Sequence, residues 1–226
     1  MKPNLKSSVS IKGPERASHR SMYKAMGLND EDLSKPLIGV ANTWNEVTPC
    51  NIYLNELSSK AKVGVKEAGG TPREFVAISV SDAISMGHEG MKASLISREI
   101  IADSIELVMF AHQYDALVGI AGCDKSLPGT MMAMARLNIP SVFVYGGTIM
   151  PGMLNGKELT VVDVYEAVGS YDAGQISLEE LKNIENTACP NAGSCGGMFT
   201  ANTMASVSEA IGLALPGSAS PPAEDD

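Results

Sequence analysis

The sequence predicts an α/β fold, a three-layer α/β/α sandwich with a mostly parallel central sheet. Four short apolar runs are nearly continuous rather than alternating, as expected for parallel strands that are covered on both faces. Helical patterns lie between the runs, and a strand–helix–strand order that repeats at this length indicates a sheet with helices on both faces. The predicted strands are 36–42, 74–80, 116–122 and 141–147.

The predicted helices follow from the spacing of apolar side chains. Residues 51–68 and 91–113 each place apolar residues three or four positions apart, which forms one helix face. The segment 129–138 is rich in good helix formers and ends before Pro140. The more polar stretch 157–186 contains a helical pattern, SLEELKNIEN, near its end. A glycine-rich turn, CPNAGSCGG, then opens a long predicted helix, and we expect the natural protein to continue beyond the acidic tail.

Composition and charge exclude several classes of protein. The chain has 226 residues, enough for one large or two small domains, and its 44% hydrophobic content is that of an ordinary globular protein. Its net charge of −9 argues against nucleic acid as a partner. Residues 1–27 lack the apolar core of a secretory signal, and no apolar window is long enough to span a bilayer. We therefore expect a cytoplasmic protein, without a membrane partner, whose four cysteines are reduced.

Reactive side chains follow the predicted strands. Ligands of open parallel sheets bind beyond the carboxyl ends of the strands, so residues that follow different strands are expected to meet there. The residues that follow the first three strands and carry thiol, carboxylate or amine groups are Cys50, Asp82, Cys123, Asp124 and Lys125.

Three of the cysteines, Cys50, Cys123 and Cys195, each precede a predicted helix. A helix N-terminus carries partial positive charge and lowers the pKa of a nearby thiol, so three such thiolates suit a metal–sulfur centre. Structural zinc usually shows closely spaced cysteine pairs, which are missing here, and scattered single cysteines fit an iron–sulfur cluster at least as well. With three protein thiolates one iron stays open as a Lewis acid. Asp82 and Asp124 are oxygen ligands suited to Mg²⁺.

Each of these residues also has an ordinary structural interpretation. A single cysteine is most often a small buried hydrophobe, and Cys189 is expected to pack in the core. Asp82 is equally interpretable as an N-cap, and Lys125 as a solvated amine. His88 and His112 are expected to be packing or surface residues rather than ligands. Met131, Met132 and Met134 are expected to belong to the core.

Two other functions compete with catalysis at a metal–sulfur centre. The stretch GIAGCDKS between a strand and a helix is loosely similar to a phosphate-binding loop, but Asp124 occupies the position of a glycine and would repel phosphate. The other is a non-catalytic domain with a structural cluster, which would not need the neighbouring carboxylates.

Four long motifs resemble the dihydroxy-acid dehydratase and phosphogluconate dehydratase family in family order. They are PCN at 49–51, SDAISMGHEGMKASLISREIIADSIE at 81–106, GCDKSLPGTMMAMARLNIPSVFVYGG at 122–147 and GSCGGMFTANTMA at 193–205. The segment MLNGKELTVVDVYEAVG at 153–169 is most similar to the dihydroxy-acid dehydratases.

The resemblance implies a set of cofactors and their ligands. Cys50, Cys123 and Cys195 would hold a 2Fe-2S cluster, or a 4Fe-4S cluster as in some relatives. Asp82 and Asp124 would bind Mg²⁺, and Lys125 would be carbamylated and so become an anionic ligand of the same ion.

The resemblance also implies a domain organisation and an activity. Residues 1–226 would be the N-terminal cluster- and Mg-binding domain, and a C-terminal β-barrel-like domain, absent from this chain, would supply a further Mg²⁺ carboxylate and the serine base. No catalytic base is therefore expected in this chain. The full enzyme would be a homodimer that dehydrates small 2,3-dihydroxy carboxylates to 2-oxo acids in branched-chain amino-acid biosynthesis, the alternative being a phosphogluconate or other sugar-acid dehydratase.

Overall fold

The computed structural model describes residues 5–224 and confirms the predicted α/β sandwich. Its centre is a sheet of four parallel strands in the order β2-β1-β3-β4. These strands are β1 (Leu37–Asn42), β2 (Thr71–Val76), β3 (Ala116–Ala121) and β4 (Ser141–Tyr145). A small antiparallel pair outside this sheet consists of β5 (Gly152–Leu154) and β6 (Lys157–Leu159).

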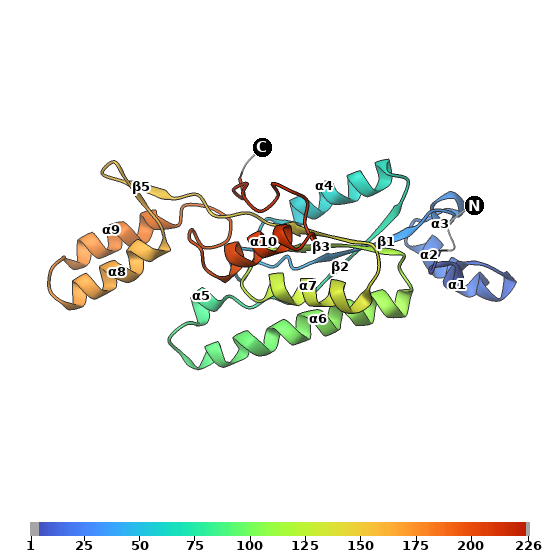
Figure 1. Ribbon diagram of the computed structural model, residues 1–226, viewed down its shortest axis with the longest axis horizontal. Helices are drawn as coiled ribbons and strands as arrows, with labels where there is room; N and C mark the ends of the chain where they lie inside the picture. The colour runs from blue at the N-terminus through green and yellow to red at the C-terminus, as the bar shows by residue number, and fades with distance from the viewer. Residues whose placement is uncertain (1–4, 225–226) are drawn as a thin grey trace.

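The helices form two outer layers and an extension at each end (Figure 1). α4 lies on one side of the sheet and α6 and α7 lie on the other, whereas α1–α3 and the pair α8 and α9 extend from opposite ends. The helices are α1 (Ser8–Ile11), η1 (Pro14–Arg16), α2 (Ala17–Ala25), α3 (Asp30–Leu33), α4 (Leu54–Glu67), α5 (Asp82–Ser85), η2 (Glu89–Met91), α6 (Lys92–His112), α7 (Ser126–Leu137), α8 (Val161–Asp172), α9 (Leu178–Ala188) and α10 (Thr200–Ala210). Within residues 5–224, none of the helices combines the length and the apolar character needed to cross a bilayer.

Alternate residues of each strand face opposite helical layers, so the sheet has a core on each side. Toward α4, the buried residues are Val40, Leu54, Val118 and Ile120. Toward α6 and α7, the larger core includes Leu37, Ile101, Ile105, Leu117, Met131 and Phe143. Burial on both faces explains why the strands read as continuous apolar runs rather than alternating ones.

The second strand differs from its predicted range of 74–80, because it both begins and ends earlier. β2 is an edge strand that pairs only with β1, from Leu37 opposite Thr71 to Asn42 opposite Val76. Since β1 ends at Asn42, the ladder closes with one last bond, from the Ala77 amide to the Asn42 carbonyl over 2.9 Å. The other three predicted strands agree with the structure to within two residues.

The segment before α9 contains structure that the apolar pattern did not predict. β5 and β6 are joined through Asn155 and Gly156, which both have positive φ (51° and 78°), as a two-residue hairpin turn requires. Thr160 then caps α8 in a capping box with Asp163. In the sequence, the Asn155-Gly156 pair indicates the hairpin turn, and an acidic residue three positions after Thr160 indicates the start of α8.

The strand order places a crevice where β1 and β3 lie side by side. From β1 the chain moves outward to β2, and it then crosses back to β3 and on to β4. In such a sheet the ligand site lies at the carboxyl ends of the two strands where the winding reverses. The loops that follow β1 and β3 carry Cys50 and Cys123.

Candidate active site

A cavity of about 620 Å³ opens at the carboxyl edge of the sheet. Side chains from five separate segments line it, which the fold brings together from distant parts of the sequence. All six residues predicted to bind cofactors contribute to its wall: Cys50, Asp82, Cys123, Asp124, Lys125 and Cys195. Their ligand roles stay predictions, whereas their placement around one cavity is an observation.

Cys50 lies in the loop between β1 and α4, and it is buried. Thr43 continues the pairing beyond β1, because its amide donates to the Ile120 carbonyl over 3.1 Å. The side-chain amide of Asn51 then donates to the Thr43 hydroxyl over 3.0 Å. The loop is thus folded back on the sheet edge, which turns Cys50 toward the cavity.

Cys123 follows β3 and immediately precedes α7. Its amide donates to the Ser126 hydroxyl over 3.0 Å, and this hydroxyl donates back to the Cys123 carbonyl over 2.6 Å. The Cys123 sulfur also lies 3.9 Å from the Thr48 hydroxyl of the Cys50 loop. Since α7 begins at Ser126, Cys123 is the one predicted thiol ligand that lies close to the start of a helix.

The thiols are electrostatically coupled, and the expectation that helix starts lower the pKa of all three is wrong. α4 and α10 begin at Leu54 and Thr200, four and five residues beyond Cys50 and Cys195, and the pKa of Cys50 is raised rather than lowered. The dominant effect is instead the interaction of the Cys50 thiol with the other two thiols. This interaction raises the pKa of Cys50, lowers the pKa of Cys123, and lowers the pKa of Cys195 to about 7.

Asp82, Asp124 and Lys125 form a charged cluster beside the thiols. The Lys125 ammonium lies 2.5 Å from one Asp82 oxygen and 3.5 Å from an Asp124 oxygen. Burial alone would raise the pKa of Asp82, but hydrogen bonds from Asp124, Lys125 and Ser94 more than offset it and hold that pKa low. Burial and the hydrogen bond to Asp82 raise the pKa of Asp124. Although burial opposes it, contact with both carboxyl groups raises the pKa of Lys125.

The donor atoms fit metal centres in their chemistry. Within residues 5–224, no group of three His, Cys, Asp or Glu side chains is arranged to hold a metal ion in this structure. The Cys50 thiol nevertheless interacts with the other two predicted thiol ligands, and the Lys125 ammonium contacts both carboxyl groups. Gathering several anionic donors in a partly buried wall is costly unless positive charge neutralises them. A metal cation would supply such positive charge, so the donor set is chemically compatible with one.

Several alternative interpretations are decided by the structure. Ser81, not Asp82, caps α5, because its hydroxyl accepts from the Ile84 amide. Cys189 does not pack in the core: it is exposed, since α9 ends at Ala188 and that residue takes the buried position. Lys125 does stand between a strand and a helix, as in a phosphate-binding loop, but its amine is committed to carboxylates.

The remaining residues with structural interpretations behave as expected. Met131 and Met134 are core residues, and Met132 packs against the same core. His88 is exposed and accepts from the Gly90 amide, and the exposed His112 stacks on Tyr114.

Sequence reasoning missed residues that shape the site from α6, α8 and α10. The Ser94 hydroxyl lies 2.8 Å from each Asp82 oxygen, and no motif distinguishes it from other serines in that helix. Tyr165 reaches the cavity from α8. Apolar side chains complete the wall, including Met86, Met91, Met198, Phe199 and Met204.

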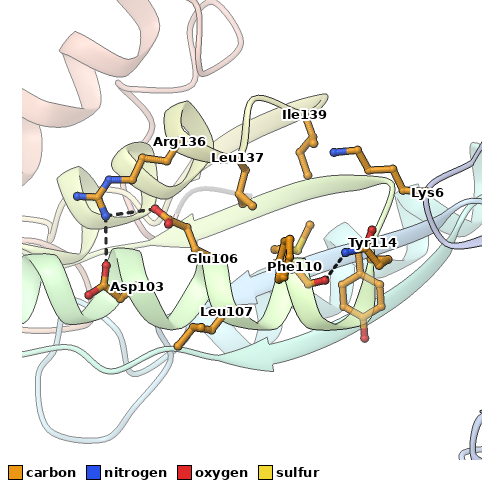
Figure 2. A pocket seen from close by; sticks show the side chains of 11 residues that line it. Lys6, Asp103, Glu106, Leu107, Phe110, Tyr114, Arg136, Leu137 and Ile139 are labelled. Carbon is orange, nitrogen blue, oxygen red and sulfur yellow. Dashed lines mark hydrogen bonds and ion pairs between the residues drawn. The ribbon is translucent and has the colours of Figure 1, made fainter. Parts of the chain in front are cut away.

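Another cavity, of about 570 Å³, lies away from the thiols beside α6 and α7 (Figure 2). Figure 2 shows the Arg136 guanidinium bonded to Asp103 and Glu106, with Phe110 farther along the same wall. Arg136 also pairs with Glu99, so its charge is satisfied by acidic neighbours. This cavity offers an ion-pair network rather than a set of reactive groups.

Comparison with known proteins agrees with the composition of the site. The family model described as "Dihydroxy-acid/6-phosphogluconate dehydratase N-terminal" matches residues 35–226. A dihydroxy-acid dehydratase of Dinoroseobacter shibae is 62% identical over 222 residues, which are 98% of this chain and 38% of that protein. One of Parvibaculum lavamentivorans is 64% identical over 211 residues, 93% of this chain and 37% of that protein.

The similarity extends to the dihydroxy-acid dehydratase of Sulfurisphaera tokodaii, which is 57% identical over 227 residues, 100% of this chain and 40% of that protein. The chain thus spans less than half the length of the curated relatives that it matches. The match over nearly the whole chain, and the family model that covers most of it, show that the chain belongs to the dihydroxy-acid/6-phosphogluconate dehydratase family and corresponds to its N-terminal region.

Proposed function

We propose that the full-length protein dehydrates small 2,3-dihydroxy carboxylates, such as 2,3-dihydroxy-isovalerate, to 2-oxo acids in branched-chain amino-acid biosynthesis. The observation that carries this proposal is the single cavity wall that joins Cys50, Cys123 and Cys195 to Asp82 and Asp124. Both kinds of donor are needed for this reaction, because one metal centre must bind the substrate and another must assist the leaving hydroxyl. A purely structural cluster would leave the two carboxyl groups without a role.

The thiols would hold a 2Fe-2S or 4Fe-4S cluster, and Asp82 and Asp124 would hold Mg²⁺. When bound, these centres would supply Lewis acidity, at the carboxylate and C2 hydroxyl on the Mg²⁺ side and at the C3 hydroxyl on the iron side. The chain's part is to present the two donor sets on one wall. It also excludes water, since Cys50 and Cys123 are buried and the surrounding wall is largely apolar.

Lys125 must change its charge before Asp82 and Asp124 can share a divalent cation. Its ammonium now neutralises both carboxyl groups, and it would repel Mg²⁺. Carbamylation resolves this conflict: the ammonium loses a proton, the amine nitrogen bonds to the carbon of CO₂, and the carbamic acid releases a second proton. The product is an anionic oxygen ligand in place of a cation.

The apolar part of the wall favours an aliphatic substrate over a phosphorylated sugar acid. Met86, Met91, Met198 and Phe199 offer contact surface for a short branched hydrocarbon chain. Among the described residues that line the cavity, the one cationic side chain is Lys125, which already pairs with carboxylates. A phosphate group would need additional cations or amide donors.

The rest of the reaction requires groups that lie beyond this chain. Loss of the C2 proton needs a base, which we expect from the C-terminal part of the full-length protein. Departure of the C3 hydroxyl then gives an enol, which converts to the 2-oxo acid. We further propose that the full-length enzyme is a cytoplasmic homodimer.

The test uses full-length protein prepared without oxygen and assayed on 2,3-dihydroxy-isovalerate and on 6-phosphogluconate. We expect the wild type to turn over 2,3-dihydroxy-isovalerate and to contain stoichiometric iron and sulfide. Cys123→Ser should lose both the turnover and the bound iron and sulfide. The matched control is Cys189→Ser, which removes an exposed thiol outside the cavity and should keep activity. Faster turnover of 6-phosphogluconate would favour the sugar-acid dehydratases, turnover of neither would favour a structural cluster, and full activity in Cys123→Ser would defeat the scheme.

A further inference from the structure

The three cysteine-bearing turns are bonded to one another through the residues that precede the cysteines. The Gly193 amide donates to the Pro49 carbonyl over 2.9 Å, which joins the Cys195 turn to the Cys50 turn. The Ser194 hydroxyl donates to the Gly122 carbonyl, which joins the Cys195 turn to the Cys123 turn. Segments that are distant in the sequence are therefore linked within two residues of each cysteine.

Ser194 is fixed in place on every side. It is completely buried, its amide donates to the Gly147 carbonyl over 3.0 Å, and its carbonyl accepts from the Ile149 amide over 2.8 Å. With both backbone groups held by the segment after β4, the direction of the side chain is set. Its hydroxyl is consequently a rigid link to Gly122 rather than a mobile surface group.

Asn202 supports the same turn from α10. Its side-chain amide donates to the carbonyls of Cys195 (3.1 Å) and Gly197 (2.7 Å). Its side-chain oxygen accepts from the Tyr145 hydroxyl over 2.6 Å and from the Thr148 hydroxyl. The Cys195 carbonyl is thereby tied to the end of β4 through a single side chain.

We propose that Ser194 and Asn202 are positioning residues that hold Cys195 at the distance from Cys50 and Cys123 at which one iron–sulfur cluster is retained. This inference rests on the proposed function, and neither residue touches a substrate. The contact between the Cys50 and Cys123 turns depends on close backbone packing at Gly122, so it does not need either side chain. Residues that orient metal ligands commonly change metal affinity by about 10- to 100-fold when they are removed.

The test compares full-length Ser194→Ala with Ser208→Ala. Ser208 is also completely buried, and its hydroxyl donates to a backbone carbonyl, that of Ala205, over 2.6 Å. The two variants therefore lose the same kind of buried hydrogen bond, but only Ser194 links two cysteine turns. The readouts are iron and sulfide content after anaerobic reconstitution, the electron paramagnetic resonance spectrum of the reduced cluster, and the rate of iron loss to a chelator.

We expect Ser194→Ala to lose iron about tenfold faster than the wild type and to show a shifted resonance spectrum, and Ser208→Ala to match the wild type in both. Asn202→Ala should resemble Ser194→Ala, and it decides the outcome if Ser194→Ala does not fold. Wild-type rates and spectra in the variant that is measured would overturn the inference.

A second readout does not depend on a bound cluster. In metal-free full-length protein carrying Cys189→Ser, mild oxidation with diamide traps Cys50 as a disulfide with either Cys123 or Cys195. We expect Ser194→Ala and Asn202→Ala to lower the proportion of Cys50–Cys195 product by about tenfold relative to Cys50–Cys123, because small displacements strongly affect such reactions. An unchanged proportion would overturn the inference. If the wild type takes up no iron while the two variants still show this lower proportion, the result would instead count against the proposed function alone.

Discussion

The carbonyl oxygen of Cys50 packs against the α-carbon of Gly122, in the space that a β-carbon would fill. A side chain at Gly122 would collide with backbone, which is unable to rotate away as a flexible side chain could. We expect Gly122→Ala to push the Cys50 and Cys123 turns apart, to lower the free energy of unfolding by about 1–3 kcal/mol, and to reduce iron content. Urea denaturation and iron analysis of the full-length protein measure both effects.

Gly64→Ala is the matched control for that substitution. Gly64 lies within α4, and a β-carbon there would meet no atom within 4 Å. Because alanine favours a helix over glycine, we expect stability to rise by about 0.5–1 kcal/mol, with iron content unchanged. Equal effects of the two substitutions would show that the turns do not depend on their close approach.

The interaction between the thiols predicts an order of reactivity in metal-free protein. Because the thiolate is the form that iodoacetamide alkylates, the lowered pKa of Cys195 places half-maximal reaction near pH 7. Burial and the neighbouring Cys195 charge raise the pKa of Cys189, so this more exposed thiol should react only at higher pH. Mass spectrometry of alkylated peptides across a pH series gives both midpoints.

Cys50→Ala provides the internal comparison, because it removes the thiol that stabilises the Cys195 thiolate. The Cys195 midpoint should then move upward toward that of an ordinary thiol. A midpoint that stays near pH 7 in this variant would mean that another group lowers the Cys195 pKa.

The bond from Ser94 to Asp82 predicts a pH-dependent loss of stability. In metal-free protein, Ser94→Ala removes hydrogen bonds of 2.8 Å to both oxygens of a buried carboxylate, at a cost of about 1–3 kcal/mol near neutral pH. The pKa of Asp82 is lowered in the folded state, so its stabilising effect is present above the unfolded pKa and disappears as pH falls through the folded pKa. The difference between variant and wild type should therefore shrink in acid.

Ser97→Ala separates this effect from the loss of any buried hydroxyl. Ser97 lies on the same helix, is also buried, and donates to the Ser94 carbonyl over 2.6 Å. Its cost should not vary with pH, since that bond involves no titrating group. Urea titrations of both variants between neutral and acidic pH would reveal parallel curves if Asp82 were irrelevant.

A carboxylate on β2 supports the loop that leads to Cys50. The Glu74 carboxylate accepts from the side-chain amide of Asn42 over 3.0 Å and from the Ser58 hydroxyl over 2.6 Å. The side-chain oxygen of Asn42 accepts from the backbone amide of Trp44 over 2.9 Å. Glu74→Ala removes one acceptor from two buried donors and the ion-pair partner of Lys62, so we expect a loss of about 1–3 kcal/mol in unfolding free energy.

Trp44 is the single tryptophan of these 226 residues, and its fluorescence reports on the same loop. In this chain we expect Glu74→Ala to shift the emission, whereas Glu67→Ala, at an exposed position near the end of α4, should change neither emission nor stability. Unchanged Trp44 emission in both variants would show that the loop is held without Glu74.

The sequence alone predicted the layers of the fold and the meeting of the six site residues, for physical reasons that are visible in individual residues. Runs such as 116–122 are apolar throughout because β3 is covered on both faces. Parallel strands place their carboxyl ends on one edge, so residues that follow β1 and β3 had to be neighbours. These inferences need only a pattern and a topology.

The remaining features of the fold and the site depend on contacts between residues that are distant in the sequence. The end of β2 depends on where β1 ends, and the low pKa of Cys195 depends on a thiol that lies far away in the sequence. Ser94 and Ser194 look like any other serine until their partners are known. Periodicity and local spacing contain no information about such pairs.

The strand-like bridge between Thr148 and Ser194 has a further consequence. All of 149–193, with the β5–β6 hairpin and the α8–α9 pair, leaves the sheet after this bridge and returns beside it, where Gly193 also bonds to Pro49 and Asn191 to Glu224. The two ends of this segment therefore lie side by side. Of its described residues, Tyr165 alone lines the thiol cavity. Exchanging this segment between distant relatives would therefore replace the one aromatic ring that it contributes to the wall of the thiol cavity.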